Sequence, residues 1–340
     1  MKKDINITLL LLWISALLLL ILMLKQLPIE SAMTWINGLE YYQWVIWGGI
    51  NSIIILIYVY RWLLINNGID FKTNFLKLLL VRQAGQSFSY ITPGPQFGGE
   101  PLQIYWLWKT DNYLGHKAFL SVALDRIFEL WINFSVLCCG IIILMLFSNT
   151  DITVWYYSLI ICVVMVIGIF LFGRLLISHD SVIISRLKKA IGYWQHSPRL
   201  KSLTLHMENV SKDAHSFFIR KPGVFYSTVL VSIIGWMGML AEIWLVLEFL
   251  KIKLSIIDFV FLVIAMRLAL LLPVPGGVGT IEATIFWVFT SLGLNTFDVV
   301  GMIAFIRVRD LAIVSAGMIA FQFLMRNTIL QEKPDQINPK

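Results

Sequence analysis

The sequence predicts an all-α polytopic membrane protein with about six full transmembrane helices and two re-entrant helical hairpins that form an inverted repeat. Three observations support this fold class. Hydrophobic residues make up 58% of the 340 residues and charged residues only 14%, well below the quarter that is usual in soluble domains. Apolar runs of membrane-spanning length recur along the chain. Two segments rich in proline and glycine, at 93–100 and 275–282, lie among these apolar runs.

The predicted spans follow from the apolar runs, since a helix needs about 20 apolar residues to cross a bilayer core. A sixth span, near 300–326, is required to return the chain to its starting side. Lys2 and Lys3 precede the first run as in a signal peptide, but no small-residue cleavage site follows, so we expect a retained helix. The five clear runs are 5–24, 44–65, 130–147, 153–177 and 224–250.

The three cysteines, Cys138, Cys139 and Cys162, lie inside apolar runs and lack the spacing of metal ligands. We interpret them as small packing residues. The five histidines share no ligand spacing either. The sequence therefore leads us to expect no metal site and no cofactor.

The distribution of basic residues predicts the orientation of the chain. Residues 174–221 carry nine Lys/Arg and three acidic residues, whereas 148–153 carry no basic residue. The positive-inside rule places the first segment in the cytoplasm and the second outside, with both termini cytoplasmic, as in a bacterial inner-membrane protein. The loop 178–221 has an amphipathic pattern that suits a helix on an anionic leaflet; its basic character alone does not call for a nucleic acid, and none is expected as a partner. We expect the tail 329–340 to be disordered.

Counting crossings leaves two segments, 74–108 and 256–294, that must each begin and end on one side of the membrane. Each has a Pro/Gly break at its middle, "PGPQFGGE" and "PGGVGTIE", in which proline, glycine and glutamate match at the same offsets. Each break is followed by a span with charged residues. We therefore expect one membrane domain, residues 1–328, with repeat units of about 74–147 and 256–326 inserted in opposite directions.

A broken helix at membrane depth must be buried in protein or line a polar cavity, and its amino-terminal N–H groups attract anions. We expect Glu100, followed by Pro101, and Thr280 to cap the two half-helices. The backbone motif comprises Thr92, Pro93, Gly94, Gly98, Gly99, Pro275, Gly276, Gly277, Gly279 and Thr280.

Intramembrane charges are costly and mark a site or a partner, so we select them as candidate substrate-binding residues. Arg126–Glu129 and Arg307–Asp310 are each three apart on a helix and can pair. Each pair is either a structural ion pair or a substrate contact. The motif glutamates, Glu100 and Glu282, either stabilise helix starts or contact the substrate. Asp125 and Arg309 remain as spare charges, and we expect a contact between them. The full candidate set is Glu100, Asp125, Arg126, Glu129, Glu282, Arg307, Arg309 and Asp310, with Glu242, Glu248 and Arg267 as further candidates.

The segments "TPGPQFGGEP", "AFLSVALDRIFEL", "LPVPGGVGTIEA" and "GMIAFIRVRD" resemble the flippase-like transmembrane domain of lysylphosphatidylglycerol synthases over roughly residues 5–328. The resemblance implies a domain that handles or translocates lipids between leaflets. Pro95 stands where the second motif has Gly277. Only 14 residues follow Arg326, so we expect no lysyltransferase domain and do not carry over the synthase activity.

These observations predict a lipid flippase or lipid-binding transporter for an anionic or lipid-linked headgroup, of phospholipid, aminoacyl-phospholipid or polyisoprenoid/hopanoid type. Its partners would be membrane lipids, with no catalytic residues assigned. Two alternatives stay open. One is an intramembrane enzyme that acts on a lipid phosphate or glycosyl carrier, with carboxylates as acid and base. The other is a membrane partner that recruits a cytoplasmic lipid- or glycan-synthesis enzyme through the basic loop.

Overall fold

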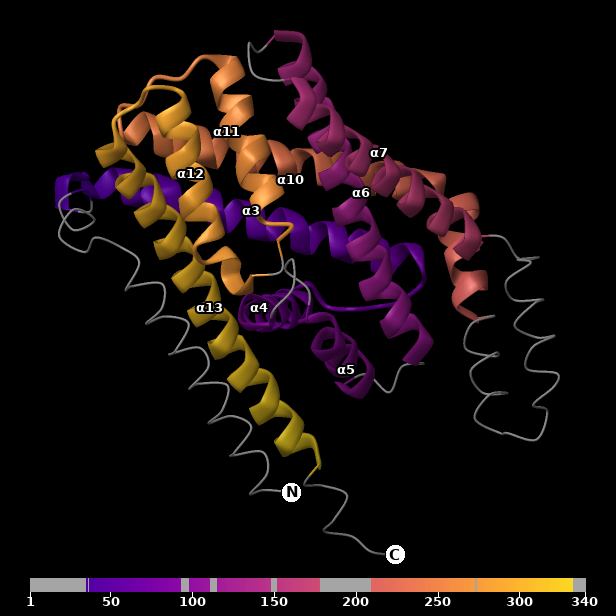
Figure 1. Ribbon diagram of the computed structural model, residues 1–340. Helices are drawn as coiled ribbons and strands as arrows, with labels where there is room; N and C mark the ends of the chain where they lie inside the picture. Colours follow the sequence, from indigo (N-terminus) through magenta and orange to yellow (C-terminus); the bar gives the residue numbers. More distant parts are fainter. Residues whose placement is uncertain are drawn as a thin grey trace, which may run out of the picture. The chain divides into compact units, whose positions relative to one another are not determined.

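The computed structural model describes residues 35, 37–92, 98–110, 115–147, 152–177, 209–272 and 274–332, which form helices and contain no β-strand (Figure 1). The predicted first span, the loop 178–208 and the tail 333–340 lie outside the described residues. The helices are α3 (Tyr41–Gly68), α4 (Phe75–Ile91), α5 (Glu100–Thr110), α6 (Gly115–Phe147), α7 (Ile152–Ile177), the π-turn η1 (Ser216–Arg220), α10 (Pro222–Phe249), α11 (Ile256–Ala269), the 3₁₀ turn η2 (Pro275–Gly277), α12 (Thr280–Ser291) and α13 (Thr296–Glu332).

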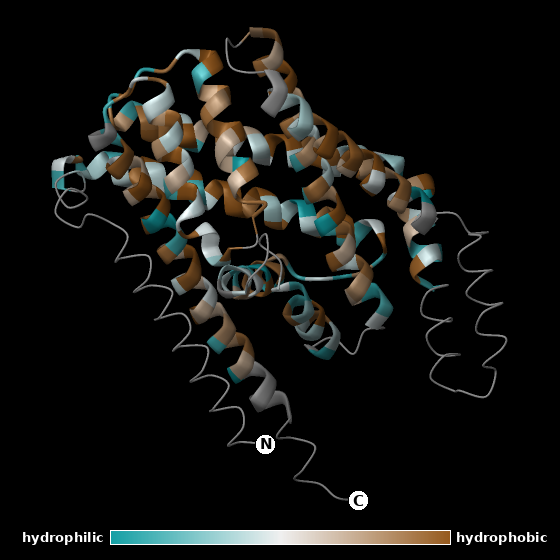
Figure 2. Cartoon of the chain, in the orientation of Figure 1, coloured by the Kyte–Doolittle hydropathy of each residue, from teal (hydrophilic) through white to brown (hydrophobic). Residues whose placement is uncertain are grey.

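Four of the described helices are long and apolar enough to cross a membrane: Tyr41–Gly68, Gly115–Phe147, Trp155–Arg174 and Pro222–Phe249. In Figure 2 the ribbons of the long helices are coloured largely from tan to brown, the hydrophobic end of the scale, with white and teal residues between them. α13 has 37 residues and is long enough to span, but three charged side chains cluster at its positions 307–310. The chain is therefore an all-α polytopic membrane protein. α13 also runs to Glu332, so the first four residues of the predicted disordered tail, 329–332, are helical.

The two predicted hairpins each consist of a pair of helices around a break. α4 and α5 flank the first Pro/Gly motif, and α11 and α12 flank the second. A side-chain oxygen caps the first helix of each pair: Asn74 Oδ1 accepts the N–H of Leu76 at 3.1 Å, and Ser255 Oγ accepts the N–H of Asp258 at 3.2 Å. Such caps satisfy backbone N–H groups that the helix leaves unpaired. Both helix pairs thus begin with a local sequence signal of the same kind.

The helix bounds repeat along the chain. α3 and α10 both have 28 residues, and the starts of α3 and α10, α4 and α11, and α6 and α13 are each 181 positions apart (222 − 41, 256 − 75 and 296 − 115). Asp70 and Lys251, also 181 apart, are the only non-glycine residues with positive φ in the described part of the chain, at 53° and 56°. The same turn therefore ends α3 and α10. The regular spacing of helix starts includes the long helix before each helix pair, α3 and α10, which the predicted repeat units left out.

The chain divides into two compact units. Of the described residues, the first unit contains those within 35–53, 80–103 and 238–332, and the second contains those within 54–79 and 104–237. In the first unit α11 packs against α12, and α12 packs against α13; in the second, α6 packs against α7 (Figure 1). The predicted repeat units are 74–147 and 256–326. The compact units have other boundaries, because 80–103, part of the first predicted repeat unit, lies in one compact unit with α11, α12 and α13.

α4 and α13 approach closely within the first unit. A Cβ added at Gly317 would lie 2.4 Å from the backbone oxygen of Gln83 and 2.6 Å from the Cβ of Ser87. The rings of Phe88 and Phe321 lie 5.2 Å apart between centroids. Glycine and serine at the crossing allow the two backbones to approach, as is common where helices pack in membranes. This contact positions the polar face of α4 beside the charged residues of α13.

Candidate functional site

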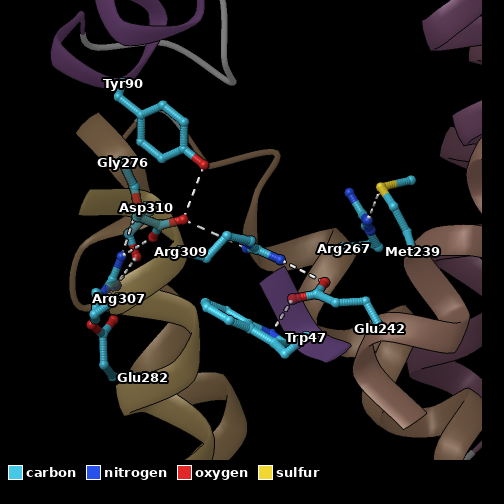
Figure 3. Close-up of polar contacts among 11 residues, drawn as sticks. Trp47, Tyr90, Met239, Glu242, Arg267, Gly276, Glu282, Arg307, Arg309 and Asp310 are labelled. Atoms are coloured by element: carbon cyan, nitrogen blue, oxygen red, sulfur yellow. Dashed lines mark hydrogen bonds and ion pairs between the residues drawn. The ribbon is translucent and has the colours of Figure 1, made fainter. Parts of the chain in front are cut away.

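Arg307 of α13 is the centre of a buried polar network in the first unit (Figure 3). Its side chain is 1% exposed. The Nε atom donates to Glu282 Oε1 at 2.6 Å, and Nη1 donates to Asp310 Oδ2 at 2.9 Å. The guanidinium also donates to the carbonyl oxygens of Gly276 and Gly277, at 3.2 and 3.4 Å. One side chain therefore fixes η2, the first turn of α12 and α13 to one another.

Each of the two motif glutamates accepts a backbone N–H from a glycine just before it. Glu282 Oε2 accepts the N–H of Gly279 at 2.8 Å, and Glu100 Oε2 accepts the N–H of Gly98 at 2.7 Å. Both glycines have positive φ, 87° and 134°, a region that glycine enters without steric cost. Each carboxylate thus satisfies a backbone donor and places a negative charge at the positive end of its helix.

Thr280 does not cap α12 as the sequence analysis predicted. The N-cap residue is Gly279, and Thr280 is the first helical residue. Its hydroxyl instead donates to the carbonyl oxygen of Gly277 at 3.1 Å. The prediction was wrong because the Glu282 carboxylate reaches back to the N-cap, which leaves the threonine hydroxyl to bond the preceding turn.

Arg309 lies two residues beyond Arg307 in a more open environment. Its side chain is 27% exposed, and Nη1 donates to Glu242 Oε2 of α10 at 2.9 Å. Glu242, 4% exposed, also accepts the indole N–H of Trp47 of α3 at 3.3 Å. Asp310 Oδ1 lies 3.5 Å from Arg309 Nη2. Among the described residues, Glu242 provides the one hydrogen-bond acceptor of this guanidinium, whose other N–H groups can serve a ligand.

Tyr90 joins the first helix pair to this network. Its hydroxyl donates to Asp310 Oδ1 at 3.0 Å, so Asp310 binds residues of both α4 and α13. Arg267 of α11 lies nearby in Figure 3, with Nη2 3.0 Å from Met239 Sδ. The ion pairs of the network join two arginines, Arg307 and Arg309, to three carboxylates, Glu242, Glu282 and Asp310.

The second unit contains another ion-pair cluster. Arg61 of α3 is 1% exposed and donates from Nε and Nη2 to Asp125 Oδ1 of α6, at 2.9 and 2.8 Å. Its Nη2 also lies 3.4 Å from Glu129 Oε2. Arg126 Nη1 lies 3.3 Å from the same Glu129 oxygen. Side-chain exposure rises from Arg61 through Asp125 and Arg126 to Glu129, which is 30% exposed.

The structure pairs Arg126 with Glu129 and Arg307 with Asp310, as the helical spacing predicts. We expected Asp125 and Arg309 to contact each other. Instead, Asp125 pairs with Arg61, and Arg309 pairs with Glu242. Thr92 donates to the carbonyl oxygen of Phe88 at 3.1 Å, whereas Pro93 and Gly94 lie outside the described residues.

The sequence analysis missed Arg61, Trp47 and Tyr90. For Arg61 a signal existed, because it is a cation within an apolar run.

Comparison with known proteins adds to this geometry. The family described as "Lysylphosphatidylglycerol synthase TM region" matches residues 7–317. A segment of 106 residues is 31% identical to a "UPF0104 membrane protein" of Methanothermobacter thermautotrophicus, and it covers 31% of this chain and 29% of that relative. No solved structure matches the chain. Because the family match extends over most of the sequence, the chain belongs to the family of the lysylphosphatidylglycerol synthase transmembrane region.

Proposed function

We propose that the protein binds membrane lipids with an anionic phosphate headgroup and moves them between leaflets, with Arg309 as the cation that contacts the phosphate. The observation that carries the proposal is the environment of Arg309: its side chain is 27% exposed, and it has one hydrogen-bond acceptor, Glu242, and a longer ion pair to Asp310 at 3.5 Å among the described residues. An arginine in an apolar helical protein is costly unless it has a partner or a site. Its planar fork of donors suits phosphate oxygens.

The other candidate cations are less suited to this role. Arg307 already binds Glu282, Asp310 and two backbone carbonyls, and it is almost fully buried. The half-helix starts carry their own acidic partners, Glu100 and Glu282, which weakens their attraction for an external anion. We therefore assign Arg307 and both glutamates to holding the breaks in shape, and Arg309 to the ligand. In the second unit the more exposed arginine of the ion-pair cluster is Arg126, 17% exposed, and it is the candidate cation there.

We further infer that α4–α5 and α11–α12 are re-entrant hairpins of an inverted repeat. If neither pair crosses the membrane, three crossings, by α3, α6 and α7, separate the start of α3 from the start of α10. An odd number of crossings inserts the helices α10–α13 in the membrane in the direction opposite to that of α3–α6. Inverted repeats with broken helices at midplane sites are typical of transporters that alternate access by rocking. In this arrangement both termini lie in the cytoplasm of a bacterial inner membrane.

The proposal is tested with the full-length protein in liposomes that contain fluorescent phosphatidylglycerol. Transport is measured as the fraction of label that becomes accessible to an impermeant quencher. We expect wild-type protein to move the label, Arg309→Gln to slow this movement at least about tenfold, and Arg174→Gln, an exposed arginine of α7, to behave as wild type. Absence of transport by folded wild-type protein, or full activity of Arg309→Gln, would overturn the proposal.

A further inference from the structure

Two glutamines of α4, Gln83 and Gln86, have buried amide atoms without hydrogen-bond partners among the described residues. Gln83 is 7% exposed, and neither its amide nitrogen nor its amide oxygen has a hydrogen-bond partner among the described residues. The amide oxygen of Gln86 is in the same situation. Buried polar groups in proteins almost always have a partner, because an unpaired one is destabilising. These amides therefore indicate a ligand or ordered water.

Both glutamines lie on the face of α4 that carries Tyr90. Residues three, four and seven apart project from one side of a helix, which places Gln83, Gln86 and Tyr90 along one stripe. The same side of α4 contacts α13, through Gly317 beside Gln83 and through the Tyr90–Asp310 hydrogen bond. A rise of 1.5 Å per residue separates Gln83 from Tyr90 by about 10 Å. The amides therefore lie on the face of α4 that meets α13, about 6 to 10 Å along the helix from the Tyr90–Asp310 contact.

The chemistry of the stripe selects a class of headgroup. An amide offers both a donor and an acceptor, and a hydroxyl group needs one of each. α4 contains no acidic residue, and the carboxylate that meets its polar face, Asp310, is already bound by Arg307 and Tyr90. A hydroxylated headgroup fits this face better than a cationic one.

We propose that Gln83 and Gln86 bind the hydroxyl groups of a glycerol or sugar headgroup whose phosphate lies at Arg309. This inference rests on the proposed function, because it assumes that a lipid phosphate occupies the Arg309 site. It adds a specificity site: Arg309 recognises the phosphate common to anionic lipids, and the two amides select those with a hydroxylated headgroup.

The test compares phosphatidylglycerol with phosphatidylpropanol of the same acyl chains, which keeps the phosphodiester and lacks the hydroxyls. Binding of each lipid to the full-length protein in nanodiscs is measured by native mass spectrometry. We expect wild-type protein to prefer phosphatidylglycerol by about tenfold, which corresponds to one or two net hydrogen bonds. Gln83→Met, close in size to glutamine, should abolish the preference by weakening phosphatidylglycerol alone. Gln86→Met should reduce it, and Gln43→Met in α3 should leave it unchanged.

Each result has a definite meaning. Equal binding of the two lipids by wild-type protein, or an unchanged preference in both Gln83→Met and Gln86→Met, would overturn the inference and leave water as the partner of the amides. Competition by soluble glycerophosphoglycerol as strong as that of the lipid would show a free phosphodiester as the ligand and would also overturn it. Arg309→Gln should weaken both lipids equally. Unchanged binding in that variant would contradict the proposed function, whatever Gln83→Met does.

Discussion

Arg61 of α3 and Glu242 of α10 lie 181 residues apart, the same spacing that separates the helices α3–α6 from α10–α13. Arg61 binds an acidic residue of α6, and Glu242 binds a basic residue of α13. Arg61 holds Asp125 of α6 at 2.8 Å, and Glu242 holds Arg309 of α13 at 2.9 Å. Arg61 and Glu242 are both buried, with 1% and 4% of their surface exposed. A buried ion between two helices fixes their pairing, so the same architectural link occurs in both sets of helices with its charges reversed.

The buried Arg61 link should matter more for stability than its exposed neighbour. Arg61→Gln leaves the Asp125 carboxylate buried without its cation, and we expect a loss of about 3 kcal/mol in the free energy of unfolding. Arg126→Gln removes a 3.3 Å pair to the more exposed Glu129 and should cost less than about 1 kcal/mol. Thermal unfolding of the purified variants in one detergent measures the difference.

A second substitution separates charge burial from loss of packing in this pair. Asp125→Asn, added to Arg61→Gln, removes the uncompensated carboxylate and should recover much of the lost thermal stability. Equal destabilisation by Arg61→Gln and Arg126→Gln, or no recovery in the double variant, would argue against the Arg61–Asp125 link.

Arg307 should not tolerate lysine, although the charge is kept. Its fork binds Glu282, Asp310 and the carbonyl oxygens of Gly276 and Gly277 at once, whereas a lysine has a single ammonium group. We expect Arg307→Lys to lower the free energy of unfolding by about 2 kcal/mol. Arg309→Lys is the matched control: it should retain wild-type stability while binding anionic lipid less tightly. Reversal of this order would show that Arg309, and not Arg307, holds the helices together.

The sequence predicted contacts that depend on helical spacing and missed those that depend on packing between distant helices. Arg126–Glu129 and Arg307–Asp310 are three residues apart, so periodicity alone brings each pair together. The contacts Arg61–Asp125, Trp47–Glu242 and Tyr90–Asp310 join residues 64, 195 and 220 positions apart. No local pattern encodes such a separation, and they follow only when the helices pack.

The turns show a similar division. The two Pro/Gly motifs correctly predicted where the helices are interrupted. Proline and glycine interrupt a helix through their own backbone properties, so their positions in the sequence are sufficient for this prediction. The cap of α12 was assigned to the wrong residue, since Thr280 and Glu282 are both able to cap and the choice depends on where the Glu282 carboxylate lies. The shared turn at Asp70 and Lys251 was not predicted, as neither residue is a glycine.

Gly98 should be essential for the first break. It has a φ of 134°, and an added Cβ would lie 2.1 Å from Thr92 Oγ1. Gly98→Ala is therefore strained in backbone and in packing, and we expect it to destabilise the protein by about 2 kcal/mol. Gly168→Ala in α7, where nothing lies within 4 Å of the added atom, should be neutral or stabilising by up to about 1 kcal/mol. Thermal unfolding compares them, and a Gly98→Ala protein as stable as wild type would show that the break adopts another conformation.

The turn after α3 should weaken in acid. Lys221 donates to Asp70 Oδ1 at 2.7 Å, and this hydrogen bond holds the pKa of Asp70 below its ordinary value. A lowered pKa in the folded state means that the contribution to stability is complete above the ordinary pKa of an aspartate. It is lost as the pH falls through that value and then through the lowered one.

Asp70→Asn isolates this effect, because asparagine tolerates the positive φ of 53° at this position and does not titrate. Both partners are partly exposed, so the wild-type advantage at pH 7 should be only about 0.5 kcal/mol. The difference in melting temperature between wild type and Asp70→Asn should shrink as the pH is lowered from 7 to 3. A difference that stays constant over this range would mean that the Asp70 carboxylate contributes nothing through its charge, and that Lys221 stabilises the turn through the carbonyl of Asn67, to which it also donates at 3.2 Å.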